Sequence, residues 1–226
     1  MSRLFVVGDS HARALALGAT ALGYDCTSFA TSAAAWRDGV MRLEADGTLT
    51  SERFRARQKI ESFQRDAHHP TPLTSGVPVV ASLGYHSSQF LTEMRLKKLG
   101  LRPVPSRSAQ SLLSSGFLAA WLEEARSTAL DGLATIARAA PLAIVTPPQF
   151  EDNPLLTALN DALGQLIRAR GLPLYDPNTA LADSHGALPA RFAHDDGKHG
   201  SAAFGCEVLK NLARQKLIPE PSARTK

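Results

Sequence analysis

Short apolar segments alternate along this chain with longer segments of helical pattern, and this alternation constrains the fold more than any other feature. The five short segments are residues 4–7, 25–29, 78–83, 142–145 and 172–175. Each is mostly apolar with little polar alternation, as expected of strands that are buried on both faces. Strands that alternate with helices form a parallel sheet covered by helices. We therefore predict a three-layer α/β/α fold of the flavodoxin-like type, with a five-stranded parallel sheet in the order 2-1-3-4-5.

The connecting segments carry their own helix signals. Residues 12–22 are rich in Ala and Leu and predict a helix directly after the first strand. Asn153 followed by Pro154 is typical of a helix start, leucines recur behind it at helical spacing, and Gly171 is a typical stop. A last helix is expected to begin near Ser201.

The length of the chain favours one domain. Two independent domains would each be small in a chain of 226 residues. We expect residues 1–216 to form the domain and residues 217–226 to be a flexible C-terminal tail. Residues 86–115, which are rich in Pro and Ser, exceed what one crossover helix requires. We predict an insertion there, close to the edge of the sheet where ligands bind in such folds.

Composition narrows the classes of partner. The formal net charge is +4, and the basic residues of 53–65 are interleaved with acidic ones, which is typical of a solvated helix face rather than of a phosphate-binding surface. Residues 1–8 hold only a short apolar run, so neither a signal peptide nor a membrane span is expected. Cys26 and Cys206 lie far apart without metal-binding spacing and are expected to be reduced and buried. We predict a cytoplasmic protein with no nucleic-acid or membrane partner and no metal or other cofactor.

Gly8-Asp9-Ser10 joins the first expected strand to the first expected helix. A serine at this junction lies at the N-terminal end of a helix, where free N–H groups and the helix dipole favour a developing negative charge. The alternative interpretation is that Asp9 or Ser10 only caps the helix.

Asp196 precedes His199 by three residues, just before the last expected helix. One short turn can aim the carboxylate at one imidazole nitrogen and leave the other nitrogen facing a nucleophile. The chain thus holds Ser, Asp and His in the order of a possible catalytic triad. An ordinary surface turn is the alternative, and His194 is a rival base with a different spacing to Asp196.

Together the two motifs resemble the SGNH (GDSL-type) hydrolase superfamily, whose members carry GDS after the first strand and DxxH before the last helix. The resemblance extends over nearly the whole chain, through GDSHARAL, VVASLGYHS, IVTPPQF and DGKHGSAAFG. It implies that Ser10 is the nucleophile, that His199 is the general base and acid, and that Asp196 orients His199.

The chain departs from the family at two oxyanion-binding positions. Family members use the serine N–H, a backbone N–H after the second strand and an Asn side chain after the third. Here no glycine follows the second strand until Gly39, and we predict the Ala34 N–H as donor. His86 stands where the Asn is expected, and a neutral imidazole can also donate one hydrogen bond. We predict an oxyanion hole of Ser10, Ala34 and His86, with simple packing at the strand end as the alternative for His86.

The substrate is expected to be a small-molecule or carbohydrate ester. We predict that four residues flanking these positions contact it: Asp9, His11, Gly84 and Tyr85. The GDSH form resembles relatives that act on acylated carbohydrates, which implies hydrolysis of a small acyl group such as acetyl through an acyl-enzyme. An O-acyltransferase with the same residues and a non-catalytic binding domain of this fold remain open. The sequence indicates no oligomeric state.

Overall fold

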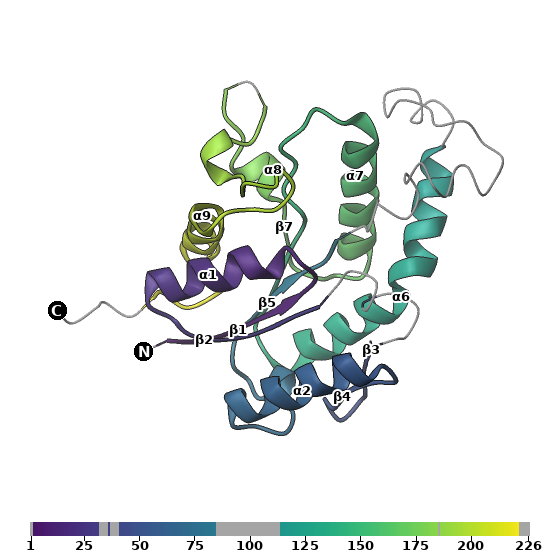
Figure 1. Cartoon of the computed structure of the whole chain (residues 1–226). Coiled ribbons are helices and arrows are strands. Elements are labelled where there is room, and N and C mark those ends of the chain that lie inside the picture. Colours follow the sequence, from purple (N-terminus) through teal and green to yellow (C-terminus); the bar gives the residue numbers. More distant parts are fainter. Residues whose placement is uncertain (1, 32–35, 37–40, 85–113, 185, 222–226) are drawn as a thin grey trace.

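The central feature of the computed structural model is a parallel sheet with helices on both sides (Figure 1). The structure describes residues 2–31, 36, 41–84, 114–184 and 186–221. The strand order in the sheet is β2-β1-β5-β6-β7, with every neighbouring pair parallel. Because β3 and β4 form a separate hairpin, this is the order 2-1-3-4-5 among the predicted strands. The predicted α/β/α flavodoxin-like fold is confirmed.

The strands lie close to the segments predicted from the apolar pattern. Their bounds are β1 Arg3–Gly8, β2 Asp25–Ala30, β5 Val79–Ser82, β6 Leu142–Val145 and β7 Leu174–Tyr175. In the register of the sheet, Gly8 pairs with Ala30 on one side and with Ser82 on the other, and Ser82 pairs with Val145. The carboxyl ends of these strands therefore share one edge, where ligands bind in doubly wound folds.

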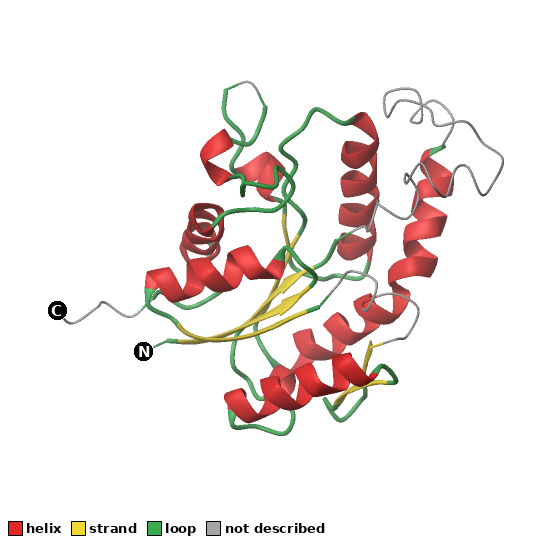
Figure 2. Cartoon of the chain, in the orientation of Figure 1, coloured by secondary structure: helices red, strands yellow, loops and turns green. Residues whose placement is uncertain are grey.

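The two faces of the sheet are covered by different helices (Figure 2). One face packs against α2 (Phe54–Ala67), α6 (Ser115–Ala139) and α7 (Pro154–Ala169), and the other against α1 (Ala12–Leu22) and α9 (Ala202–Arg214). Successive residues of β1 serve both cores, because strand side chains alternate between faces. Phe5 enters the first core and Val6 the second, and both are fully buried. This explains the continuous apolar strands of the sequence.

Polar side chains cap the N-terminal ends of three long helices, α6, α7 and α9. Asn153 accepts hydrogen bonds from the N–H groups of Leu155 and Leu156 and caps α7 as predicted. Ser201 caps α9 through the N–H of Phe204, and Ser114 caps α6 through the N–H of Phe117. In each case the side chain satisfies an N–H that has no partner within the helix.

The structure adds elements that the apolar pattern did not predict. A hairpin of β3 (Met41–Leu43) and β4 (Leu49–Ser51) follows β2. The basic stretch lies in α2, whose other face is buried through Ala56, Ile60 and Phe63. The remaining short elements are η2 Pro72–Thr74, α8 Pro177–Ala180 and η3 Ala190–Phe192. The basic side chains of residues 53–65 are exposed, as expected of a solvated helix face.

The end of the chain departs from the expected flexible tail. Ile218 is only 4% exposed and belongs to the core on the α9 side. The Tyr24 hydroxyl donates to the carbonyl of Pro219 over 2.7 Å, and Ser2 donates to the carbonyl of Glu220 over 2.8 Å. These contacts attach the chain to the body beyond residue 217, where the tail was expected to begin. Most of the predicted insertion, residues 86–113, lies outside the described residues.

Two further expectations concern membranes and cysteines. In the part of the chain that the structure describes, no helix combines the length and the apolar character that crossing a bilayer requires. Cys26 and Cys206 are both free thiols, and both are half-buried rather than fully buried. Burial, together with the neighbouring Asp25 carboxylate, raises the pKa of Cys26 to about 12.

Candidate functional site

Helices α1 and α9 cross so closely that their backbones touch. A Cβ atom on Gly205 would lie 1.9 Å from the carbonyl oxygen of Ala14, and one on Gly18 would lie 2.3 Å from the carbonyl carbon of Gly205. Ser10 stands just before α1 and His199 just before α9. The crossing therefore brings the two ends of the sequence together at the carboxyl edge of the sheet.

Three residues predicted from the sequence form a continuous hydrogen-bonded chain. The Oγ of Ser10 lies 2.9 Å from Nε2 of His199, and Nδ1 of His199 lies 2.6 Å from Oδ2 of Asp196. A proton on Nδ1 directed at the carboxylate leaves Nε2 as the acceptor for the Ser10 hydroxyl. Ser10 is exposed, so a ligand can reach its hydroxyl from solvent.

The Asp196 carboxylate is fixed by its own turn. Its Oδ1 accepts the backbone N–H groups of Lys198 and His199, each over 2.9 Å. Gly197 adopts a φ of 67°, a left-handed conformation that glycine takes without steric cost. The backbone N–H of His199 and then its imidazole, followed by the backbone N–H of Lys198, hold the pKa of Asp196 well below its usual range. The carboxylate is therefore ionised at neutral pH.

Asp9, predicted as a substrate contact, has a different place. Its side chain is almost fully buried, at 3% exposure. Its Oδ1 accepts the hydroxyl of Ser82 over 2.9 Å and the backbone N–H of His11 over 3.0 Å. The prediction is corrected, because a buried carboxylate engaged in this way ties the end of β1 to β5 and does not face a ligand.

Glycines allow this close approach of β1 and β5. A Cβ atom on Gly8 would lie 2.2 Å from the carbonyl oxygen of Ser82, and one on Gly84 would lie 2.2 Å from Oδ2 of Asp9. Gly84 is buried, and its Cα packs against the Asp9 carboxylate. The predicted substrate contact at Gly84 is thus corrected to a packing role beside Asp9.

Arg126 is the residue of this region that sequence reasoning missed. It lies on α6 and is only 1% exposed, and its Nε donates to the carbonyl oxygen of Gly84 over 2.6 Å. A buried guanidinium needs such partners, because an unsatisfied buried charge is costly. The available signal was its position on the apolar stripe of α6, between Leu122 and Ala129.

His11 lies against His199. The two ring centroids are 4.8 Å apart and the rings are inclined at 42°. The His11 side chain as a whole is half-buried, while its Nδ1 is completely covered and has no hydrogen-bond partner in the described residues. Burial, above all, lowers the pKa of His11, and His199 acts in the same direction against the carboxylates of Asp9 and Asp196.

The rival base His194 does not reach the serine through any contact in the described residues. Its backbone N–H donates to the carbonyl of His199, and its Nδ1 lies 3.9 Å from Oδ1 of Asp196. His199 is the imidazole that contacts Ser10. Among the described residues no group of three His, Cys, Asp or Glu side chains lies close enough to hold a metal ion.

The predicted oxyanion donors divide into two groups. Ala34 and His86, with the predicted substrate contact Tyr85, lie outside the described residues, and their roles stay predictions. The N–H of Ser10 precedes α1 and has no acceptor among the described residues. It is available to a ligand at the serine.

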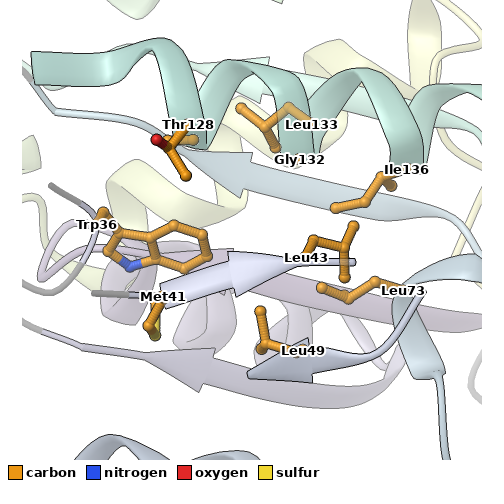
Figure 3. A pocket seen from close by; sticks show the side chains of 10 residues that line it. Trp36, Met41, Leu43, Leu49, Leu73, Thr128, Gly132, Leu133 and Ile136 are labelled. Atoms are coloured by element: carbon orange, nitrogen blue, oxygen red, sulfur yellow. The ribbon is translucent and has the colours of Figure 1, made fainter. Parts of the chain in front are cut away.

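An apolar cavity lies between the β3–β4 hairpin and α6. Figure 3 shows side chains from the β3–β4 hairpin and from α6 facing one another across it, with the Trp36 ring at one end. The indole N–H of Trp36 donates to the carbonyl oxygen of Gly8 over 2.7 Å. The tryptophan thus connects the wall of the cavity to the last residue of β1, two residues before Ser10.

No protein-family model matches this chain, and a search of curated proteins also finds no match. Solved structures of similar shape include the periplasmic domain of a lipopolysaccharide acetyltransferase from Salmonella ser. Paratyphi A, with 11% identity, 96% of this chain and 84% of that chain covered, and a TM-score of 0.48. An extracellular lipase from Streptomyces rimosus is 14% identical, with 93% of this chain and 99% of the lipase chain covered and a TM-score of 0.47. A putative acylhydrolase from Bacteroides fragilis is 15% identical, with 96% of this chain and 86% of the acylhydrolase chain covered and a TM-score of 0.42.

Proposed function

We propose that this protein is a serine esterase of the SGNH type that hydrolyses a small acyl ester through an acyl-enzyme. The observation that carries the proposal is the hydrogen-bonded chain from Ser10 through both nitrogens of His199 to Asp196. A serine that only caps a helix bonds a backbone N–H, as Ser114 does at the start of α6. At the start of α1 it is Asp9 whose side chain accepts a backbone N–H, that of His11, whereas the Ser10 hydroxyl contacts an imidazole.

Acylation begins when Ser10 Oγ attacks the ester carbonyl carbon. Its proton passes to Nε2 of His199, which lies within hydrogen-bond distance. The imidazolium that forms is stabilised by Asp196, whose low pKa keeps the carboxylate ionised. His199 then returns the proton to the leaving alkoxide, the C–O bond of the ester breaks, and the acyl group remains on Ser10.

Deacylation repeats these steps with water as the nucleophile. His199 removes a proton from a water molecule that attacks the acyl carbonyl, and then gives that proton to Ser10 Oγ as the enzyme ester breaks. The products are a carboxylic acid and the free serine. The same groups acting with a sugar hydroxyl in place of water would make an O-acyltransferase, which is the second candidate activity.

The negative charge of the tetrahedral intermediate requires N–H donors. The free N–H of Ser10 lies beside the start of α1, where the helix dipole favours negative charge. We propose that Ala34 and His86 supply the remaining donors. Their sequence positions, after the second and third predicted strands, support this role.

The proposed substrate is a carbohydrate that carries a small acyl group such as acetyl. The loop before α9 presents exposed polar side chains beside His199, among them His194, Asp195 and Lys198. Side chains of this kind suit an alcohol portion rich in hydroxyl groups, since they offer both donors and acceptors. The GDSH motif supports the same class of substrate by resemblance.

The test is covalent labelling of the folded protein with a fluorophosphonate probe, followed by peptide mapping. We expect an adduct on Ser10 and none on Ser114, a serine at a helix start without an imidazole. Ser10→Ala should abolish labelling and reduce hydrolysis of p-nitrophenyl acetate by roughly 10³-fold or more, because members of a triad act as a unit. His199→Ala should slow both reactions by a similar factor.

Ser114→Ala is the matched control and should label and turn over like the wild type. A folded wild-type protein that remains unlabelled would refute the esterase and favour the non-catalytic binding domain. If Ser10 is labelled but acetyl ester is consumed only when a sugar acceptor is added, the activity is that of the O-acyltransferase.

A further inference from the structure

We infer that His11 is a positioning residue, whose ring holds the imidazole of His199 in the orientation that reaches Ser10. The inference rests on the proposed function, and on the contact between the two rings, whose centroids lie 4.8 Å apart. The position of His11 is itself determined by the start of α1. Its N–H donates to Oδ1 of Asp9 over 3.0 Å, and its carbonyl accepts the N–H of Ala14 over 3.2 Å.

His199 needs this support because the orientation of its ring decides whether both hydrogen bonds form. Nδ1 is bonded to Asp196 and Nε2 to Ser10, on either side of Cε1. Rotation of the ring about the Cβ–Cγ bond moves both nitrogens away from their partners. The His199 side chain is 35% exposed and belongs to an exposed loop, so packing on its solvent side does not oppose that rotation. The His11 ring that lies against it does.

His199 depends most on the support of His11 in the acyl-enzyme. Once Ser10 Oγ carries an acyl group it has no proton to donate to His199, and one of the two hydrogen bonds is lost. Among the contacts described for the His199 side chain, those to Asp196 and His11 then remain. His199 must nevertheless stay aligned to activate water. The contribution of His11 is therefore larger in deacylation than in acylation.

The chemistry of the second imidazole fits this role. Burial lowers the pKa of His11, while the carboxylates facing it, on Asp9 and Asp196, oppose the shift, and His199 adds to it. A ring that stays neutral does not repel the imidazolium formed on His199. The covered Nδ1 of His11 hydrogen-bonds to no group in the described part of the chain. The contact that the structure shows for the His11 side chain is the packing of its ring against the His199 ring.

The test compares His11→Ala with His11→Phe, which keeps a flat ring without nitrogens. Burst and steady-state kinetics on p-nitrophenyl acetate separate acylation from deacylation, and proton NMR observes the His199 Nδ1 proton shared with Asp196. For His11→Ala we expect kcat to fall roughly 10- to 100-fold, the scale of a small misplacement, and the NMR signal to broaden. The ratio kcat/KM should fall less, because Ser10 still holds His199 during acylation. His11→Phe should restore kcat and the signal.

Arg13→Ala is the matched control, since this neighbouring residue of α1 is exposed, and it should match the wild type in every readout. If His11→Ala loses thermal stability, His11→Leu fills the space without a flat ring and should show the same kinetic defect. An unchanged kcat with an intact NMR signal in folded His11→Ala would overturn the inference. So would a folded His11→Phe variant as slow as the Ala variant. A wild type without esterase activity, but with the expected NMR changes, would refute the proposed function and leave the positioning role intact.

Discussion

The two halves of the candidate site are held by different kinds of contact. On the Ser10 side, Asp9 and Arg126 are buried and bond partners 73 and 42 residues away in the sequence. On the His199 side, Asp196 is exposed and bonds backbone N–H groups two and three residues further along the chain. The position of Ser10, the proposed nucleophile, is therefore a property of the sheet, and the position of Asp196 and His199, the proposed acid–base pair, is a property of one turn. Damage to the first should cost stability, while damage to the second should cost only activity.

The two halves of the site meet where α1 crosses α9. Gly205→Ala, which disrupts this crossing, is expected to lower the free energy of unfolding more than any other variant below. The added Cβ would lie 1.9 Å from a backbone oxygen of α1, so the helices have to separate. We expect a loss of about 2–3 kcal/mol in the free energy of unfolding, the usual cost of overpacking. Ser10 and His199 should separate at the same time, and fluorophosphonate labelling should fall.

Gly116→Ala is the control for the glycine prediction. It also lies in a helix, and the nearest atom to its added Cβ among the described residues would be 4.0 Å away. This variant should gain up to about 1 kcal/mol from helix propensity. Urea unfolding of both variants checks the difference, and equal stability changes would show that the crossing tolerates a side chain.

A smaller loss of stability is expected from the single variant Asp9→Ala, and Asp196→Ala is the variant to compare with it. Removing the Asp9 carboxylate leaves the buried hydroxyl of Ser82 without its acceptor, so we expect a loss of about 2 kcal/mol in the free energy of unfolding. Removing the exposed Asp196 carboxylate should change stability by less than about 1 kcal/mol. It should nevertheless reduce labelling of Ser10 strongly, because His199 loses its orienting partner.

Chemical unfolding measures the stability of each variant, and labelling of the folded protein measures its site. The contrast between the two halves of the site is refuted if Asp9→Ala and Asp196→Ala lower the free energy of unfolding by the same amount. It also fails if Asp196→Ala labels at the wild-type rate.

The smallest changes in stability are expected from two buried tyrosine hydroxyls. They compare a polar group that has a hydrogen-bond partner with one that has none in the described residues. The Tyr24 hydroxyl donates to Pro219, whereas the Tyr175 hydroxyl, in the core beside α9, is buried and has no hydrogen-bond partner in the described residues. Tyr24→Phe should cost about 1 kcal/mol of stability, and Tyr175→Phe should cost nothing or stabilise slightly. Thermal unfolding at neutral pH tests both expectations.

The pH dependence gives Tyr175 a second signature. Burial, and secondarily the Glu207 carboxylate, raises the pKa of Tyr175 to about 12. Since the pKa of an unfolded tyrosine is about 10, its contribution to stability is complete below pH 10 and is lost as the pH rises through the folded pKa. Tyr175→Phe lacks this loss, so its stability relative to the wild type should increase above about pH 10. A difference that stays constant up to pH 12 would contradict the assignment.

The sequence by itself determined the architecture and the residues that come together at its edge. Apolar strands separated by helices can be arranged in only a few topologies. The strand predicted at residues 142–145 has the same bounds in the structure, because a strand buried on both faces has an unambiguous apolar pattern. Ser10 before α1 and His199 before α9 were also readable, because short motifs at element ends keep their place relative to those elements. Local chemistry and topology suffice for such features.

Only the tertiary structure decided which polar residues are buried and which face a ligand. Asp9 and Gly84 were expected to contact substrate and instead pack against each other. Arg126 is buried against Gly84, and Ile218 belongs to the core rather than to a tail. The physical reason is that burial is set by contacts between residues far apart in the chain. A polar side chain in a motif has the same local sequence signature whether a second strand, a helix or solvent lies beside it.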